Sequence, residues 1–276
     1  AKDAVDAEIL DVIVGGRPVK FDEDDKDAPK EPVKQMFLDI LKEQYDVEEE
    51  DFLSAEIEVV PAGPARDMGL DRSMILGYGH DDRVCAYPAW KACLDETSDQ
   101  HTVMVILADK EEIGSEGTTG MQSAIFTDLN DELATAFGVS AAAVRAHSKC
   151  LSADVTAAYD PNYPEVCEKT NSVFLSCGAG MMKFTGARGK SGSNDANAEF
   201  LAYLRKLFDE NGVVWQTGEL GKVDEGGGGT VAKFIAKFNI DTVDIGVPVI
   251  SMHSPWEVVS KADLYENYLA FKAFIK

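Results

Sequence analysis

Two adjacent glutamates, Glu111 and Glu112, stand between an apolar run at 102–108 (TVMVILA) and a glycine-rich turn at 114–120 (GSEGTTG). Side-by-side carboxylates repel each other, so a site that uses both must compensate this repulsion. Neighbouring side chains of a regular strand point to opposite faces, so the chain must leave strand geometry here, and Gly114 permits such a turn. We expect one glutamate to bind a metal ion and its neighbour to act as a general base.

Further acidic and imidazole groups stand where strands are expected to end. His253 follows the apolar run 247–252, Asp154 lies in a loop closed by two prolines, and Asp81 and Asp82 precede a helical pattern. Because these groups would repel or displace one another if they met unaided, a divalent cation, or a pair of them, is needed. Mixed histidine and carboxylate ligation suits zinc, manganese or cobalt, and suits calcium less well.

A pair of ions about 3.5–4 Å apart polarises a carbonyl and makes a nucleophile from water near neutral pH. One carboxylate must bridge the ions, and a second, non-ligating carboxylate must carry the proton to the leaving amine. The pattern therefore points to amide hydrolysis. Ordinary structural roles stay open for each residue: a solvated glutamate pair, a structural histidine, a helix cap at Asp81–Asp82 and a turn at Asp154.

From about residue 70 the sequence alternates strand, loop and helix. Strands are predicted at 102–108, 171–176, 212–217 and 241–252. One helix is expected to be capped by Asn194 or Asp195 and to end at Gly212, and a last helix to begin with a capping box, Ser260 and Asp263. This alternation predicts an α/β fold, a three-layer sandwich with a mostly parallel central sheet flanked by helices. Sites in such folds gather beyond the carboxyl ends of the strands.

The first 65 residues are acidic and less regular. A strand is predicted at 8–16, a helix opened by Pro32 over 32–45, and a strand at 54–65.

The composition indicates which kinds of partner and which cellular compartment to expect. The 276 residues carry a formal charge of −23, which argues against a nucleic-acid partner. Five cysteines without a CxxC pair favour a reducing, cytoplasmic location. The sequence has no run of about 18 apolar residues, so no membrane span is expected. The segment GARGKS is no phosphate loop, because Phe184 stands where that motif needs glycine.

Several motifs, in order, resemble those of the aspartyl aminopeptidase family of co-catalytic metallopeptidases, and in particular its bacterial branch. They are GHDDRVCAY, DKEEIGS, LSADVTAAYDPNYPE, TGARGKSGSNDA, DEGGGGT and SMHSPWEVVSKADL. The resemblance implies that Asp81 bridges two metals and that Glu111 is the general base. It further implies that Glu112, Asp154 and His253 are metal ligands.

The same resemblance implies a cis peptide bond between Asp81 and Asp82, and a role for Lys183 in binding an acidic substrate side chain. It implies a metal-dependent aminopeptidase that removes N-terminal residues, with Asp and Glu the leading candidates, from peptides. Two divalent ions are expected, zinc first and manganese or cobalt as alternatives. Full-length relatives form dimer-based dodecamers, so a homo-oligomer is expected.

The chain resembles an N-terminally truncated member of this family. Residues 1–70 correspond to the C-terminal remnant of a β-rich dimerisation lobe, and residues 71–276 to the catalytic domain without its N-terminal portion. The family's fifth ligand, a histidine in an H-x-D-S-P type segment, has no counterpart here, and Ala157 and Asp160 replace histidines common in the family. Two alternatives stay open: a non-catalytic assembly or peptide-binding subunit, and a related di-metal deacylase.

Overall fold

The computed structural model describes residues 7–21, 26 and 28–276, and the chain divides into two compact units, Ala1–Val59 and Val60–Lys276. The first unit contains α1 (Pro32–Tyr45) and the short 3-10 helices η1 (Ala7–Ile9) and η2 (Glu49–Leu53). Helix α1 has the predicted bounds. It begins with Pro32 and is closed by the C-cap Asp46, which has a left-handed backbone (φ 56°); the Asp46 N–H donates to the Lys42 carbonyl and the Val47 N–H to the Leu41 carbonyl.

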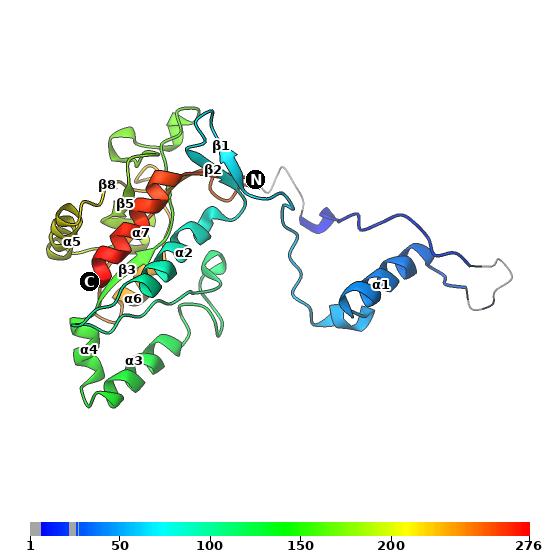
Figure 1. Ribbon diagram of the computed structural model, residues 1–276, viewed down its shortest axis with the longest axis horizontal. Coiled ribbons are helices and arrows are strands. Elements are labelled where there is room, and N and C mark those ends of the chain that lie inside the picture. The colour runs from blue at the N-terminus through cyan, green and yellow to red at the C-terminus, as the bar shows by residue number, and fades with distance from the viewer. Residues whose placement is uncertain (1–6, 22–25, 27) are drawn as a thin grey trace. The chain divides into compact units, whose positions relative to one another are not determined.

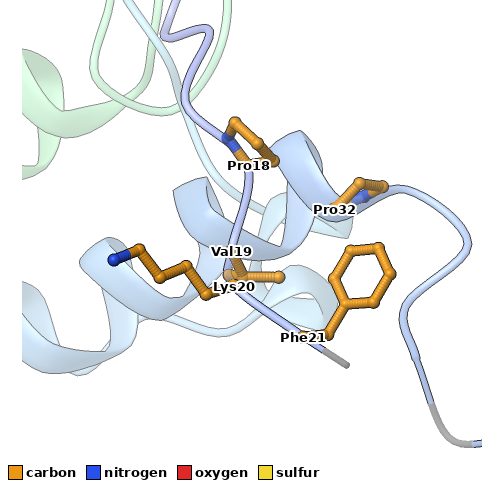
Figure 2. A pocket seen from close by; sticks show the side chains of 5 residues that line it. All are labelled: Pro18, Val19, Lys20, Phe21 and Pro32. Atoms are coloured by element: carbon orange, nitrogen blue, oxygen red, sulfur yellow. The ribbon is translucent and has the colours of Figure 1, made fainter. Parts of the chain in front are cut away.

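The strands predicted at 8–16 and 54–65 are wrong. The first segment has η1 followed by irregular chain, the second is irregular, and within the described part of this unit neither finds a strand to pair with. An isolated strand leaves its backbone groups to water and is not stable alone. A hollow lined by Pro18, Val19, Lys20, Phe21 and Pro32 lies at the start of α1 (Figure 2), and these side chains offer no acidic or imidazole ligand.

The second unit holds two sheets and a hairpin. Figure 1 labels strands of both sheets. The five-stranded sheet has the order β1 (Arg66–Met68), β2 (Met74–Gly77), β11 (Glu257–Ser260), β10 (Pro248–Ile250), β4 (Thr156–Ala157). The four-stranded sheet has the order β3 (Lys149–Ala153), β9 (Asp241–Gly246), β5 (Ala179–Met182), β8 (Trp215–Thr217). The hairpin joins β6 (Phe184–Ala187) to β7 (Ser191–Asp195).

Strand directions are mixed. In the four-stranded sheet β3 runs parallel to β9 and β5 parallel to β8, and only β5 and β9 are antiparallel, in keeping with the predicted mostly parallel sheet. The five-stranded sheet is chiefly antiparallel, with β10 and β4 as its parallel pair.

Helices cover both faces of the four-stranded sheet. Alternate residues of β9, Val243 and Ile245, enter a core with α2 (His80–Asp95), α5 (Ala198–Glu210) and α7 (Lys261–Ile275). On the opposite face Cys150 of β3 packs near α6 (Ala232–Ala236) and α3 (Ile125–Ala136), while its neighbour Leu151 faces the first core. Figure 1 shows α2 and α7 side by side on one face. This alternation of buried side chains confirms the predicted layered α/β fold.

Two of the predicted strands did not form. Residues 102–108 are irregular, with Met104, Ile106 and Leu107 exposed, and they find no partner strand in the described chain. Residues 171–176 make only an isolated bridge, from Val173 to Ala158. The predictions at 212–217 and 241–252 are confirmed by β8, β9 and β10, with a break at Val247.

Helix capping also differs from prediction. Asn197 caps α5, accepting the N–H of Phe200 at 2.7 Å, because Asn194 and Asp195 belong to β7. The unit also contains α4 (Ala141–His147) and the short 3-10 helices η3 (Glu111–Ile113), η4 (Pro164–Val166) and η5 (Lys169–Asn171). At the start of α7 the capping box is absent. The buried Asp263 carboxylate instead accepts the N–H groups of Ser176 and Gly178, both at 2.7 Å, and so fixes the loop before β5.

Candidate metal centre

Asp81 and Asp82 lie where β2 passes into α2. Gly79 takes a left-handed backbone (φ 70°) at the helix start, and the Asp81–Asp82 peptide bond is cis, as the resemblance implied. Both aspartates have non-helical backbone angles, and neither side chain caps the helix. A simple capping role therefore does not account for them.

Glu111 and Glu112 open a single 3-10 turn, η3 (Glu111–Ile113), instead of continuing a strand. Lys110 before the turn and Gly114 after it both have positive φ, and the Gly114 N–H donates to the Glu111 carbonyl at 3.0 Å. The expected departure from strand geometry is therefore confirmed. Glu112 is exposed and Glu111 is half-buried, so the two neighbours occupy different environments.

His253 follows β10 in a tight turn with φ +64°, and it meets two of the predicted ligands. Its Nε2 lies 2.9 Å from Oδ2 of Asp81 and 3.1 Å from Oε1 of Glu112. These three residues come from chain segments on different elements, so tertiary folding alone brings them together. One ligand atom from each lies within 4.8 Å of the others.

Asp154 follows β3 and belongs to a second cluster with Asp81 and Asp82, again with ligand atoms within 4.8 Å of one another. Gly246 of β9 allows the Asp154 backbone to pass close by, because a Cβ there would lie 1.8 Å from the Asp154 carbonyl oxygen. Asp81 is common to both clusters. The structure thus brings Asp81, Glu112, Asp154 and His253 into one region, with Asp81 at its centre.

The clustered acids strongly perturb one another. Burial, followed by the charge of Glu112, raises the pKa of Asp81 to about 6. Burial also raises the pKa of Asp82 and of Asp154 well above the usual carboxyl range; the charge of Asp81 adds to the shift of Asp82, and the charge of Asp82 to that of Asp154. Oδ1 of Asp82 is buried without a hydrogen-bond partner. Protons or cations must therefore compensate this concentration of charge.

The donor set fits a divalent metal. Two ligands about 2.0–2.1 Å from a tetrahedral zinc ion lie roughly 3.3 Å apart. The separations from His253 Nε2 to Asp81 and Glu112, 2.9 and 3.1 Å, are close to that value. An imidazole with two carboxylates is a donor set typical of zinc, and the neighbouring three-carboxylate cluster supplies hard oxygen ligands.

Glu111 stands beside these clusters and belongs to neither. Burial, then the charges of Glu112 and Asp81, raises the pKa of its carboxyl group. Among the basic groups that act on it, Lys233 of α6 has the largest effect and lowers that pKa. A half-buried carboxylate next to the metal ligands is placed to exchange protons with a reacting group.

Lys183 lies between β5 and β6, where its ammonium group forms an ion pair with Asp195. Both side chains are exposed. The predicted substrate-binding lysine is therefore paired with the last residue of β7.

Sequence reasoning missed Glu257, the first residue of β11. Its Oε2 accepts the N–H of Asp81 at 3.0 Å, and its Oε1 accepts the N–H of His253 at 2.8 Å. Its position four residues after His253, at the head of the strand EVVS, was the available signal.

Comparison with known proteins decides the family. The model of the family described as aminopeptidase I zinc metalloprotease (M18) matches residues 4–275. The chain belongs to the M18 family. This confirms the resemblance, and with it a metal cofactor becomes a property of the family to which the chain belongs.

Individual M18 proteins show how much of the family the chain represents. A probable M18 family aminopeptidase 1 of Clostridium acetobutylicum is 47% identical over 279 residues, covering 100% of this chain and 59% of that protein. The crystal structure of aminopeptidase I from the same organism matches with a TM-score of 0.87 at 48% identity, covering 96% of this chain and 57% of that chain. The chain thus spans somewhat more than half the length of these relatives.

A more distant M18 structure supports the fold alone. The mApe1 dodecamer of S. cerevisiae matches with a TM-score of 0.66 at 23% identity, over 78% of this chain and 48% of that chain.

Among the described helices, none is both long and apolar enough to cross a membrane.

Proposed function

We propose that this chain carries the metal centre of an aminopeptidase that hydrolyses N-terminal residues from peptides. The observation that supports this most is the meeting of His253 with Asp81 and Glu112, while Glu111 stays outside both ligand clusters. That arrangement separates metal binding from proton transfer between adjacent residues, as hydrolysis of an amide needs.

In the proposed reaction Asp81, which belongs to both ligand clusters, would be a shared ligand of the metal centre, and Asp154, Glu112 and His253 would contribute the other ligands. Bound ions, zinc foremost with manganese or cobalt as alternatives, supply carbonyl polarisation and a lowered pKa for water. Glu111 accepts a proton as water adds to the scissile carbonyl. It then gives the proton to the leaving amine as the C–N bond breaks, so it returns to its starting state.

We further propose that the whole protein is a cytoplasmic homo-oligomer built from dimers. Five free cysteines support a reducing compartment, and the dodecamer named for mApe1 is the family precedent for assembly. Residues 1–70 are proposed to belong to the dimerisation lobe and residues 71–276 to the catalytic domain. The metal centre lies entirely within the unit Val60–Lys276.

A substrate panel tests the activity. The whole protein, loaded with Zn²⁺, is expected to cleave aminoacyl substrates that have a free α-amine and to leave the matched N-acylated substrates intact. Activity should disappear with a chelator and return with added Zn²⁺ or Mn²⁺, because the ligands lie at an exposed edge: the side chains of His253 and Glu112 are both 60% exposed. Cleavage of N-acylated substrates alone would favour a deacylase. Inactivity of a protein that binds metal would favour an assembly subunit.

Preference for acidic N-terminal residues is proposed to depend on Lys183. Lys183→Met should lower kcat/KM for Asp and Glu substrates about 10–100-fold, the value of a charge-assisted hydrogen bond, and spare Leu and Ala substrates. Loss of the exposed pair with Asp195 should change stability little. Lys190→Met, in the same hairpin, is the matched control. If Lys233→Met removes the acidic preference and Lys183→Met does not, the assignment to Lys183 is wrong.

A further inference from the structure

The carboxylate of Glu257 connects the two backbone segments that carry the metal ligands. Each of its oxygens accepts one N–H: Oε2 that of Asp81, 176 positions earlier, at 3.0 Å, and Oε1 that of His253 at 2.8 Å. Both donors belong to residues whose side-chain atoms meet at 2.9 Å. A single side chain therefore fixes the backbone on both sides of that contact.

Glu257 is held rigidly itself. Its side chain is 2% exposed, and the residue is paired in register with Gly77 at the end of β2, two residues before the turn that leads to Asp81. A carboxylate buried in this way loses its hydration, and it persists only when hydrogen bonds and nearby positive charge replace the water. The N–H groups of Asp81 and His253 supply two of these hydrogen bonds, and a divalent ion in the adjoining cluster would supply positive charge.

His253 needs such support because its backbone is unusual. A non-glycine residue with φ +64° lies in a sparsely populated region, and the surroundings must offset the strain. The imidazole is 60% exposed, so packing alone restrains it little. The His253 N–H is held by its bond to Glu257. The rest of the turn's backbone is held by the bond from the Ser254 N–H to the Ser251 carbonyl and by two bonds between Ser254 Oγ and the Trp256 backbone.

We propose that Glu257 is a positioning residue for the metal centre: it sets the separation of Asp81 and His253 that a divalent ion requires. This inference rests on the metal-binding part of the proposed function and not on peptidase activity. It differs from a purely structural role in one respect. Loss of Glu257 should lower metal affinity, whereas loss of a purely structural carboxylate should lower stability and leave metal affinity unchanged.

Asp263 provides the matched control. It is also a fully buried carboxylate that accepts two backbone N–H groups, those of Ser176 and Gly178, and it belongs to neither metal-ligand cluster. Glu257→Gln and Asp263→Asn each keep the side-chain volume and replace one acceptor oxygen with an NH₂ group that faces an N–H donor. Both variants should lose comparable stability, since each leaves one buried backbone donor unpaired.

Titration with Zn²⁺ and the visible spectrum of the Co²⁺-loaded protein test the proposal. Glu257→Gln should lower Zn²⁺ affinity about 10–100-fold, as loss of an outer-shell partner does, and should alter the Co²⁺ absorption bands. Asp263→Asn should leave both unchanged while lowering the melting temperature. Glu257→Asp, which keeps the charge but is one methylene too short to reach both amides, should also weaken Zn²⁺ binding and serves if the glutamine variant does not fold.

Two results overturn the inference. One is parental Zn²⁺ affinity and Co²⁺ spectrum in the folded Glu257 variants. The other is an equal loss of affinity in Asp263→Asn. Both would leave the proposed function standing, because the parent chain would still bind metal. Failure of the parent chain to bind Zn²⁺ would overturn the proposed metal centre and this inference together.

Discussion

Glu111→Gln is expected to abolish turnover while metal binding survives. Glutamine has the shape of glutamate but cannot accept the proton from the attacking water, and loss of a positioned general base costs about 10²–10⁴-fold in kcat. Glu111 takes no part in either ligand cluster, so its substitution removes no metal-binding atom. The raised pKa of the Glu111 carboxyl group, caused first by burial and then by Glu112, brings its proton affinity closer to that needed at neutral pH.

Steady-state kinetics and metal content, measured on the same samples, check this result. Glu112→Gln should show the complementary behaviour: Zn²⁺ affinity falls, because the oxygen 3.1 Å from His253 Nε2 belongs to a charged ligand. Glu116→Gln is the control from the same loop; its carboxylate accepts a bond from Gln122, and its substitution should leave kinetics and metal content unchanged. If Glu111→Gln loses metal and Glu112→Gln keeps it, the two roles are exchanged.

Much of the candidate site was predictable because its residues follow a simple topological rule. His253 comes shortly after an apolar segment predicted as a strand, which forms β10, and the ends of strands in layered α/β folds gather functional groups; Asp154 follows β3, a strand that was not predicted. Adjacent side chains of a strand point to opposite faces, so the expected joint use of Glu111 and Glu112 predicted a local break in strand geometry, and η3 is that break. Which of the two glutamates binds metal came from the family resemblance, because side-chain direction in an irregular turn cannot be read from spacing.

Other features depend on contacts that one sequence does not reveal. Glu257 is one of 49 acidic residues. Its importance comes from the two backbone N–H groups that it accepts: that of Asp81, which is distant along the chain, and that of His253, which lies in a turn whose geometry the sequence does not reveal. The apolar residues at 102–108 have strand composition, but a strand also requires a partner, and the described chain provides none. Asp263 had the spacing of a capping box, yet it satisfies a neighbouring loop instead, because tertiary donors competed with the helix end.

The metal-free chain is expected to lose stability as pH rises above about 4, and bound Zn²⁺ should remove most of that loss. The folded-state pKa of Asp81, about 6, lies above its ordinary value of 3.8, so between these values the folded chain binds more protons than the unfolded chain. Stability from this group is therefore full below pH 3.8 and lost as pH rises through 6. The upward shift of the Asp81 pKa corresponds to roughly 3 kcal/mol of unfolding free energy from this group alone. The raised pKa values of Asp82 and Asp154 change stability in the same direction.

Thermal unfolding of chelator-treated and Zn²⁺-loaded protein between pH 4 and 8 measures the effect. Zn²⁺ replaces the protons, so the stabilisation should grow with pH and reach about 2.7 kcal/mol at a free Zn²⁺ concentration 100 times Kd. Buried Asp244 and Asp263, whose pKa values burial also raises, contribute equally with and without metal and cancel in the difference. Asp154→Asn removes one clustered charge, so its metal-free form should be more stable than the parent at pH 8 and gain less from Zn²⁺. A gain from Zn²⁺ that is the same at pH 5 and pH 8 would show that the clustered carboxylates do not bind the ion.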